Sequence, residues 1–321
     1  MSLPRLRLDG LSPRDLREAL STYGCFQLVD PRVSVDRARS VLGDARRFFA
    51  LPPSAKAKLG IDRSRHFRGY SELRNERDWR EQIHFGAETP EAGADPPYLQ
   101  LAGPNLWPPD PTWRQQMTSY LGDVVSIGEE VLSIVARSLD LPADRFHALT
   151  HEPYVLMKLI YYHPQPQAGR TRPGVASHVD FSWVTLTLQD ETGGLEMRRP
   201  DGKWIDVPPV PGTLLVHVGE LLSFVTRDFY PATPHRVINP SSERPRVSIP
   251  IFLNANLNAT IEPLGAWGER RAARARELSP DEHVHRFLPL DAAAQGFVYG
   301  EAEWRRKGLD EWCVECTGAI R

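Results

Sequence analysis

Short apolar runs alternate with turn-forming residues in the middle of the chain, between Tyr154 and Asn254. The runs are VLMKLIYY, VTLTLQD, GLEM, KWIDV, GTLLVHVG, HRVIN and RVSIPIFL. Strand-length apolar runs separated by turn signals are typical of an antiparallel sandwich or jelly roll. We therefore expect a fold of mixed α and β content that is mainly β in its core, over about residues 152–256.

Helical patterns precede this core. Ser12 and Pro13 are typical of a helix start and Gly24 of a helix end, and residues 25–29 then predict a buried strand. A second amphipathic helix is expected over residues 35–49. The beginning of the chain thus predicts two helices that pack against the β core.

A loop rich in proline and glycine is expected over residues 87–111, and apolar residues at helical spacing predict a long helix over residues 117–139. Further helices are expected between residues 266 and 312. These boundaries suggest an N-terminal region, 1–110, that packs on a second region, 111–321, which holds the core and the C-terminal helices.

Arginines are interleaved with acidic residues from Arg63 to Glu81. Because the two signs nearly balance, this pattern favours a solvated mixed-charge surface over a nucleic-acid contact. The segment, extended to His84, is nevertheless one of the stretches that could contribute to a substrate pocket.

The stretch GVASHVDFSWVTLTLQDETGGLEM, residues 174–197, carries the first candidate chemistry. Its alternation predicts a strand with one buried face, from which His178 and Asp180 point to the same side. Phe181 and Trp183 have the opposite parity to Asp180 and are expected to pack against flanking helices. An imidazole and a carboxylate that share a cavity suggest a metal site, which needs a second histidine from elsewhere.

The candidates for that histidine are His217 and His235. Two histidines and one carboxylate leave three coordination positions open, which suits non-haem Fe(II) and oxygen chemistry. Zinc is usually held by more nitrogen or sulfur, and magnesium by more oxygen.

Arg246 and Ser248 lie two residues apart on a predicted strand and therefore face the same side. A guanidinium can bind a carboxylate through two hydrogen bonds, and the hydroxyl can add a third. A dicarboxylic co-substrate could chelate iron at one end and contact Arg246 at the other. Phe252 shares this parity and is expected to line the same cavity.

The order of these residues resembles the Fe(II)- and 2-oxoglutarate-dependent dioxygenases of the isopenicillin N synthase-like type. Further segments in the family's order are YGCFQLVD, FFALPPSAKAKL, FRGYSE, DWREQIHF, MKLIYYHPQP, GTLLVHVGELL and VYGEAEWRRKG. The resemblance implies a double-stranded β-helix, a dioxygenase N-terminal region over 1–110, and iron ligands His178, Asp180 and His235. It also implies that Arg246 and Ser248 bind the distal carboxylate of 2-oxoglutarate, with a hydrogen bond from Tyr162. The implied reaction consumes O2 and releases succinate and CO2, with hydroxylation of the substrate as the default outcome.

Two departures from the family pattern stand out. The Asn-x-Tyr-Pro-x-Cys run appears here as residues 160–165, which keep Tyr162 but lose the asparagine, the following proline and the cysteine. His217 occupies a position where the family commonly has asparagine. It is expected either to be a structural histidine inside the sheet or to contact the metal ligands or substrate. Phe252, Arg170 and Arg172 are further candidates for substrate contact.

The composition of the chain limits the kinds of molecule that it is expected to bind. The chain has 321 residues, of which 41% are hydrophobic and 25% are charged, as in ordinary globular proteins. Its net charge is −2, so the electrostatic potential of the whole protein does not attract nucleic acid or an anionic membrane. We expect a small-molecule substrate and a monomer or weak homo-oligomer. Three cysteines are too few for a disulfide framework and, with no expected signal peptide or membrane span, favour the cytoplasm. The pair Cys313 and Cys316 is not expected to bind zinc or to act in redox chemistry.

Three alternatives remain at this point. Isopenicillin N synthase itself and the aminocyclopropanecarboxylate oxidases also carry Arg-x-Ser but do not use 2-oxoglutarate. A jelly roll can instead serve as a non-catalytic ligand-binding module, which would take up no oxygen. A zinc hydrolase is disfavoured, because no separate general base lies close to the three candidate ligands in sequence.

Overall fold

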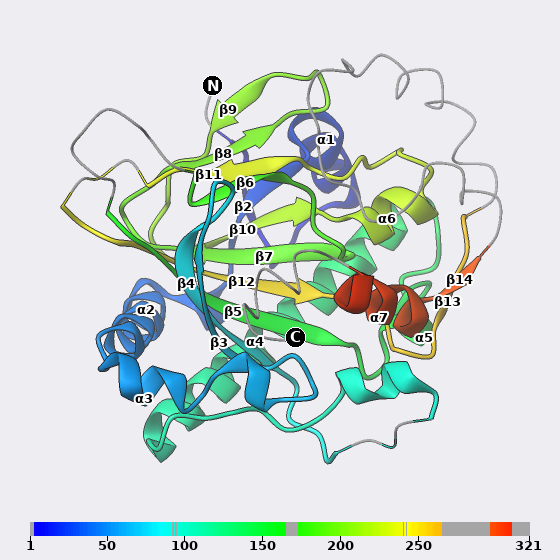
Figure 1. Ribbon diagram of the computed structural model, residues 1–321. Coiled ribbons are helices and arrows are strands. Elements are labelled where there is room, and N and C mark those ends of the chain that lie inside the picture. The colour runs from blue at the N-terminus through cyan, green and yellow to red at the C-terminus, as the bar shows by residue number, and fades with distance from the viewer. Residues whose placement is uncertain are drawn as a thin grey trace.

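Helices and strands alternate in the first half of the chain, and the second half is mostly strands (Figure 1). The computed structural model describes residues 3–91, 93, 95–164, 173–239, 241, 243–264 and 296–309. The helices are α1 (Pro13–Tyr23), α2 (Val35–Phe49), α3 (Pro53–Ala57), α4 (Pro111–Ser138), α5 (His147–Thr150), α6 (Glu220–Val225) and α7 (Tyr299–Leu309). Short 3-10 helices occupy Pro31–Val33, Ile61–Arg63 and Pro97–Leu101.

The strands form two larger sheets and one short pair within the described residues. The strands are β1 (Arg5–Arg7), β2 (Cys25–Val29), β3 (Gly69–Arg74), β4 (Trp79–Gly86), β5 (Val155–Tyr162), β6 (Val175–His178), β7 (Val184–Gln189), β8 (Leu195–Arg198), β9 (Trp204–Asp206), β10 (Thr213–Val218), β11 (His235–Val237), β12 (Arg246–Leu253), β13 (Thr260–Ile261) and β14 (Phe297–Val298). The large sheet has the order β1-β2-β10-β7-β12-β5-β4-β3 and the small sheet the order β6-β11-β8-β9. This architecture confirms the predicted β core of jelly-roll type.

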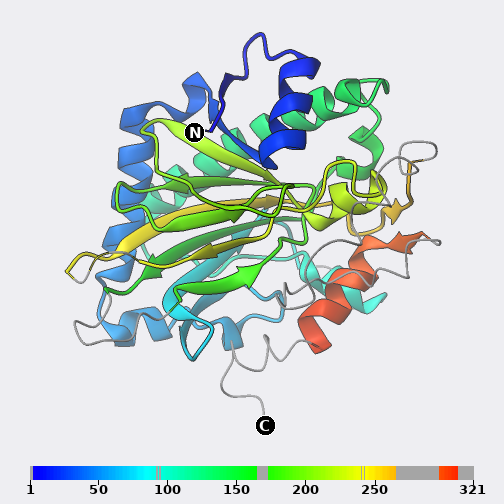
Figure 2. The ribbon, with the colours of Figure 1, turned by 90° about the horizontal axis from the view of Figure 1, so that it is seen from above.

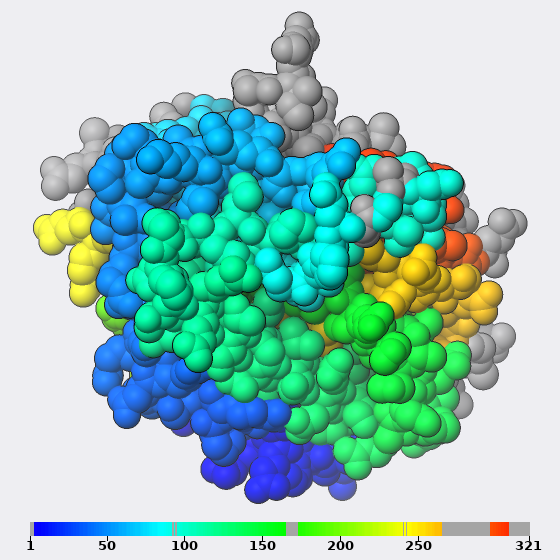
Figure 3. Space-filling view, turned by 90° about the horizontal axis from the view of Figure 1, so that it is seen from below, coloured from blue at the N-terminus to red at the C-terminus, as the bar shows by residue number. Residues whose placement is uncertain are grey.

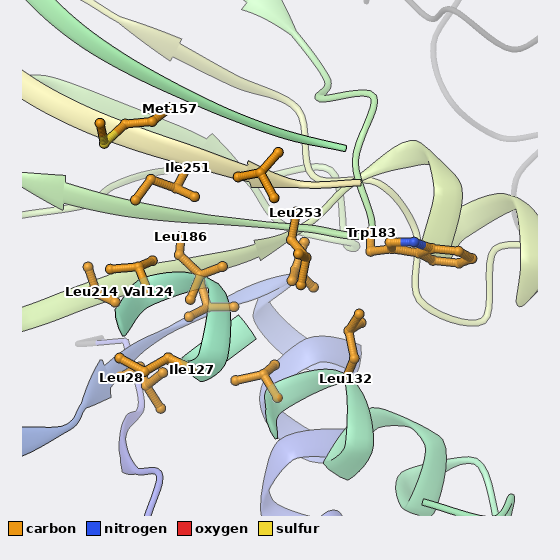
Figure 4. Packing of buried hydrophobic residues seen from close by; sticks show 14 of the residues in the cluster. Leu28, Val124, Ile127, Leu132, Met157, Trp183, Leu186, Leu214, Ile251 and Leu253 are labelled. Carbon is orange, nitrogen blue, oxygen red and sulfur yellow. The ribbon is translucent and has the colours of Figure 1, made fainter. Parts of the chain in front are cut away.

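The outer face of the large sheet is apolar and packs against helices. Leu186, Ile251 and Leu253 point from this face toward Val124 and Ile127 of α4, as Figure 4 shows. All five side chains are fully buried. The N-terminal helices and α4 cover this side of the molecule, blue and teal in the view from below (Figure 3).

The inner face of the large sheet looks toward the small sheet. Ile160 of β5 and Leu215 of β10 pack there with Met197 of β8 and Val237 of β11, in a second and smaller apolar cluster. Helix α7, red in Figure 2, lies beside the two sheets near the end of β12. The space between the sheets is therefore bounded on three sides, by two sheets and a helix.

The predicted N-terminal elements are confirmed. Ser12 accepts a hydrogen bond from the Asp15 backbone N–H and begins α1, and Gly24, with φ of 73°, ends it. Helix α2 spans the predicted residues, and β2 follows α1 as a buried strand. Strands β1 to β4 of the N-terminal region join the same sheet as the core strands, so the proposed boundary near residue 110 stays a prediction.

One sequence interpretation is wrong in part and a second is wrong. The charged segment predicted as a solvated surface keeps side chains such as Arg63, Glu72 and Arg74 exposed, but it extends into the β3–β4 hairpin, in which Arg80 and Glu81 are buried. Residues 174–197 do not form one strand from His178 onward. β6 ends at His178 in the small sheet, and β7 begins at Val184 in the large sheet, because the intervening turn carries the chain from one sheet to the other.

Three of the earlier predictions fall outside the described residues. These are the helix expected near residues 266–287, the cysteines Cys313 and Cys316, and the substrate candidates Arg170 and Arg172. None of the helices in the described ranges combines the length and the apolar content needed to cross a membrane.

Candidate active site

A cavity of about 110 Å³ lies between the two sheets, and α7 contributes to its wall. Its polar lining comes mainly from β4, β5 and β12 of the large sheet and from β6 and β11 of the small one. The predicted site residues on this wall are His178, Asp180, His235, Arg246, Ser248, Tyr162, Phe252 and His217. The fold thus brings together every predicted site residue that the structure describes.

Strand pairing brings the two candidate histidine ligands together. β6 and β11 are antiparallel, and His178 lies directly opposite His235, with ring centroids 4.2 Å apart. Asp180 follows two residues after the end of β6. One nitrogen or oxygen atom of each residue lies within 4.8 Å of those of the other two. This donor set could hold a metal ion, and its composition is the one that suits non-haem Fe(II).

Backbone carbonyls orient both imidazoles. The Nδ1 atom of His178 lies 2.9 Å from the Ala176 carbonyl oxygen, and that of His235 lies 3.1 Å from the Thr233 carbonyl oxygen. An Nδ1–H that donates to a carbonyl leaves the Nε2 lone pair available to a metal. These Nε2 atoms lie 3.5 Å and 3.7 Å from Oδ1 of Asp180, so all three donors converge.

Burial and neighbouring side chains together determine the protonation states of His235 and Asp180. Burial and then the charge of His178 lower the pKa of His235 to about 3, so its ring is neutral at neutral pH. Burial alone would raise the pKa of Asp180, but the neighbouring His235 and His178 side chains outweigh it and hold that pKa well below its ordinary value. The Thr185 hydroxyl also donates to Oδ2 of Asp180 at 2.6 Å. A neutral imidazole and an ionised carboxylate are the forms that bind metals.

The structure places His217 beside this cluster, at the inner face of β10. Its Nε2 lies 3.4 Å from Oδ2 of Asp180, and its ring centroid lies 4.7 Å from that of His235. Its Nδ1 atom makes no hydrogen bond with the described residues. Burial lowers the pKa of His217 as well. His217 therefore borders the three candidate ligands without belonging to the group whose donor atoms converge.

Arg246 lies at another part of the same cavity and is 1% exposed. Its Nε donates to the Gly193 carbonyl at 2.7 Å and its Nη2 to the Gln189 side chain at 2.8 Å. Its Nη1 has no hydrogen-bond partner among the described residues. The ring of Tyr162 lies 4.9 Å from the guanidinium carbon. Because buried N–H donors are normally satisfied, this orphaned nitrogen indicates that an acceptor binds here.

Alternate side chains of β12 point into the cavity, so the residues that follow Arg246 at intervals of two lie beside it on the same face. Ser248, Pro250, Phe252 and Asn254 also line the cavity, as their shared parity requires. Across the ladder, Arg246 pairs with Tyr162 of β5. The cavity wall of this strand thus changes from cationic at its beginning to aromatic and amide near its end.

Sequence reasoning did not single out several residues of the cavity wall, although some lie in the segment up to His84 and in the C-terminal helices, which were expected to contribute to a substrate pocket. They are Arg77, Asp78, Arg80, Lys158, Phe181, Glu303 and Arg306. Lys158 could have been found, because it shares the parity of Tyr162 on the same strand. Phe181 does pack against a helix, stacked on Tyr299 of α7 at 5.5 Å, but it lines the cavity as well. Trp183, in contrast, packs against Phe146 away from the cavity.

Comparison with known proteins agrees with this geometry. The model of the 2OG-Fe(II) oxygenase superfamily matches residues 153–255, and the model described as non-haem dioxygenase in morphine synthesis N-terminal matches residues 12–110. A 2-oxoglutarate-Fe(II) type oxidoreductase of Emericella nidulans, hxnY, is 34% identical over 261 residues, which cover 76% of this chain and 74% of the relative. The chain belongs to the 2OG-Fe(II) oxygenase superfamily.

Solved structures show the same fold. A 2OG-Fe(II) oxygenase family protein from Caulobacter crescentus has a TM-score of 0.75 and 25% identity, over 97% of this chain and 100% of that one. A full-length Neurospora crassa protein in complex with alpha-KG and thymine has a TM-score of 0.76 and 22% identity, over 96% of each chain. The expected enzyme class is confirmed: the chain is a non-haem iron dioxygenase whose cofactors are Fe(II), the co-substrate 2-oxoglutarate and O2.

Proposed function

We propose that His178, Asp180 and His235 hold the Fe(II) of this oxygenase, and that Arg246 and Ser248 hold 2-oxoglutarate. A single observation carries the proposal. The three converging donors and the orphaned guanidinium nitrogen of Arg246 line one and the same cavity. A dicarboxylate that reaches from the metal to the guanidinium would satisfy both.

The side chains fit the two groups they are proposed to hold. The two imidazoles of His178 and His235 and the ionised carboxylate of Asp180 match the preference of ferrous iron for mixed nitrogen and oxygen donors. The Arg246 guanidinium offers a buried N–H group to a carboxylate, and the Ser248 hydroxyl on the same face can add a further donor. Tyr162, below the guanidinium, holds it in place and is proposed to donate its hydroxyl to the same carboxylate.

Together, bound iron, 2-oxoglutarate and O2 supply the oxidising power, with succinate and CO2 released as co-products. The protein orients these groups and excludes water. Thr185 fixes the Asp180 carboxylate by its hydrogen bond. Leu156, Phe181 and Phe252 present an apolar part of the wall to the substrate. A substrate C–H bond held there would be protected from solvent, which supports hydroxylation of a small molecule as the outcome.

The substitution Asp180→Asn tests the metal site, because it keeps the size of the side chain and removes its charge. After anaerobic reconstitution with Fe(II), we expect at least about 100-fold weaker iron binding, beyond the range seen for residues that only support ligands. Succinate formation should fall in parallel. Asp206→Asn, on the exposed end of β9, is the matched control and should bind iron as the wild type does. Full iron occupancy and normal succinate formation in Asp180→Asn would exclude the proposed ligand set.

The use of 2-oxoglutarate and the type of oxidation are determined by analysing the reaction products. Succinate formed in step with the oxidised product would separate this enzyme from family members that do not use 2-oxoglutarate. Labelled oxygen from O2 in the product would identify oxygen insertion, and the structure of that product would separate hydroxylation from epoxidation, whereas desaturation or ring closure would leave no label. We further propose that the enzyme acts in the cytoplasm on small molecules, without nucleic acid, as a monomer or weak homo-oligomer.

A further inference from the structure

Asn254 follows β12 directly and carries a buried amide on the cavity wall. It lines the cavity two residues after Phe252 and is 3% exposed. Its Nδ2 donates to the Phe252 carbonyl oxygen at 3.4 Å, whereas its Oδ1 has no hydrogen-bond partner among the described residues. Because buried polar groups are normally satisfied, this oxygen indicates that a donor binds here.

The neighbouring backbone determines which way the Asn254 amide points. Exchanging its oxygen and nitrogen would set the side-chain oxygen against the Phe252 carbonyl oxygen, and neither atom carries a hydrogen to share. The amide nitrogen therefore stays on the backbone of its own strand. The oxygen is left for a group from outside the strand, so this position offers a ligand an acceptor.

The register between β7 and β12 orders the cavity along its length. Arg246 donates to Gln189 at the end of β7, and Phe252 pairs with Thr185, whose hydroxyl binds a candidate metal ligand. Gln189 and Thr185 are four residues apart, roughly 13 Å at the usual rise of a strand. Asn254 lies two residues beyond Phe252. Along the strand, the metal position is therefore between the co-substrate end and Asn254.

Apolar side chains line the cavity on the same side as Asn254. Phe252 precedes it on the same face, and Leu156 pairs with Phe252 from β5. Phe181, in the turn after β6, is stacked on Tyr299 of α7 and also lines the cavity. A lone acceptor is costly beside apolar groups, so a ligand that brings a donor gains more here than at the surface.

The charged side chains on this part of the wall leave the Asn254 oxygen without a donor. Arg306 of α7 binds both oxygens of Glu303, at 2.6 Å and 2.7 Å. The Lys158 ammonium lies 5.0 Å from the centre of the Phe252 ring. None of these groups hydrogen-bonds to Oδ1 of Asn254 in the described part of the chain. The missing donor is therefore one that a ligand can supply.

We propose that the substrate is a small, largely apolar molecule with an N–H or O–H group, and that Asn254 is the specificity-determining residue that accepts a hydrogen bond from this group. The apolar body would lie against Phe252, Phe181 and Leu156, between Asn254 and the metal position. This inference rests on the proposed function, because it assigns Asp180 to the metal and Arg246 to the co-substrate.

Matched ligand pairs test the proposal without turnover. The full chain is loaded with Mn(II) and saturating 2-oxoglutarate, so that the co-substrate position is filled, and is titrated by calorimetry at pH 7. Each pair has nearly the same shape and differs in one polar hydrogen: indole and benzofuran, phenol and fluorobenzene, and ε-caprolactam and ε-caprolactone. We expect at least one donor to bind about fivefold or more tightly than its partner, the range of a neutral hydrogen bond to a buried group.

Variants assign this preference to one oxygen atom. Asn254→Leu keeps the branching of the side chain without an acceptor and should reduce the preference to less than about twofold. Asn254→Ala removes the same oxygen without adding bulk and should do likewise. Asn254→Asp keeps an acceptor oxygen in either protonation state and should keep the preference.

The matched control is Asn258→Leu, four residues further on, where the asparagine is exposed and lies outside the cavity. It should show the wild-type preference. Affinity for 2-oxoglutarate should stay within about threefold of the wild type in all four variants, because its proposed contacts lie at the other end of β12.

Three results would overturn the proposal. The donors of the panel bind no more tightly than their partners, or do not bind at all. The preference persists in both Asn254→Leu and Asn254→Ala, which would assign the donor to another acceptor. A loss of 2-oxoglutarate affinity in these two variants would assign Asn254 to the co-substrate. If the metal-loaded wild type binds 2-oxoglutarate but prefers no donor, this inference alone fails, whereas failure to bind 2-oxoglutarate means that the proposed function fails first.

Discussion

The two faces of the large sheet are made from the same strands but differ in their polar content. On β12, Val247, Ile249 and Ile251 point outward into the apolar core, whereas Arg246 and Ser248 point inward to the cavity. The outer face is covered by α4 and is continuous with the main core. The inner face carries charged and hydroxyl groups that the protein itself satisfies only in part.

This difference separates stability from function along a single strand. Burial of the outer residues favours folding, because apolar area is removed from water and the packing is dense. The inner residues contribute less to folding and leave donors such as Arg246 Nη1 for ligands. Substitutions on the two faces of β12 should therefore have opposite signatures, and the following experiments test that.

Arg246→Met should give the largest effect and should act on the inner face alone. Loss of the guanidinium leaves a buried carboxylate of the co-substrate uncompensated, which costs about 3–5 kcal/mol, or roughly a 100- to 4,000-fold loss of 2-oxoglutarate affinity. Without ligand, the free energy of unfolding should change by no more than about 2 kcal/mol, because removing a buried charge offsets the lost hydrogen bonds. Calorimetry with Mn(II) and urea unfolding measure the two quantities.

The control for this variant is Arg39→Met, whose side chain is 73% exposed in a helix surface pair with Asp36. Its 2-oxoglutarate affinity should equal that of the wild type. Comparable affinity in Arg246→Met would show that the orphaned nitrogen has another purpose, and the division between the two faces would no longer hold at this end of the cavity.

Ile251→Ala tests the outer face, five residues along the same strand. Ile251 is fully buried against α4 (Figure 4), so its truncation should lower the free energy of unfolding by about 2–5 kcal/mol. Affinity for 2-oxoglutarate should stay within about threefold at temperatures where the variant is folded. Ile251→Val, which removes one methyl group, should cost only about 0.5–1.5 kcal/mol. A stable Ile251→Ala variant with weakened 2-oxoglutarate binding would contradict the assignment of this face.

Sequence patterns predicted the secondary structure and the strand parity better than the contacts between distant segments. Alternation in β12 gave the strand and the cavity parity of Phe252, and capping residues gave the ends of α1. Strand alternation and helix caps depend on residues that are close together in sequence, so a short stretch of sequence is enough to predict them. The set His178, Asp180 and His235 followed from the family resemblance, since spacing alone did not choose between His217 and His235.

The missed residues depend on contacts that are distant in sequence. Arg80 was taken as part of a solvated surface because its segment is balanced in charge, yet strand pairing with β5 buries it beside Asp78. Glu303 and Arg306 reach the cavity only because α7, near the end of the chain, packs beside β12 (Figure 1). Likewise, the break between β6 and β7 reflects a change of sheet, which a local period cannot show.

His84→Gln should give the smallest effect. It tests the inner face through the pH dependence of the free energy of unfolding. Burial first, and then the cations around it, hold the pKa of His84 below its ordinary value, so the folded protein keeps the ring neutral while the unfolded chain takes up a proton as the pH falls. The stability that the neutral ring confers is thus present above the unfolded pKa of about 6.5 and is lost below it, by up to about 1.4 kcal/mol per pH unit. Between pH 7 and pH 5.5, the free energy of unfolding of His84→Gln should fall by about 1 kcal/mol less than that of the wild type.

His151→Gln, at an exposed position outside the cavity, should follow the wild type in the same urea titrations. Equal acid sensitivity of His84→Gln and wild type would mean that the folded protein does not hold the His84 ring neutral, and that burial and the neighbouring cations act on this position of the inner face less than the structure indicates.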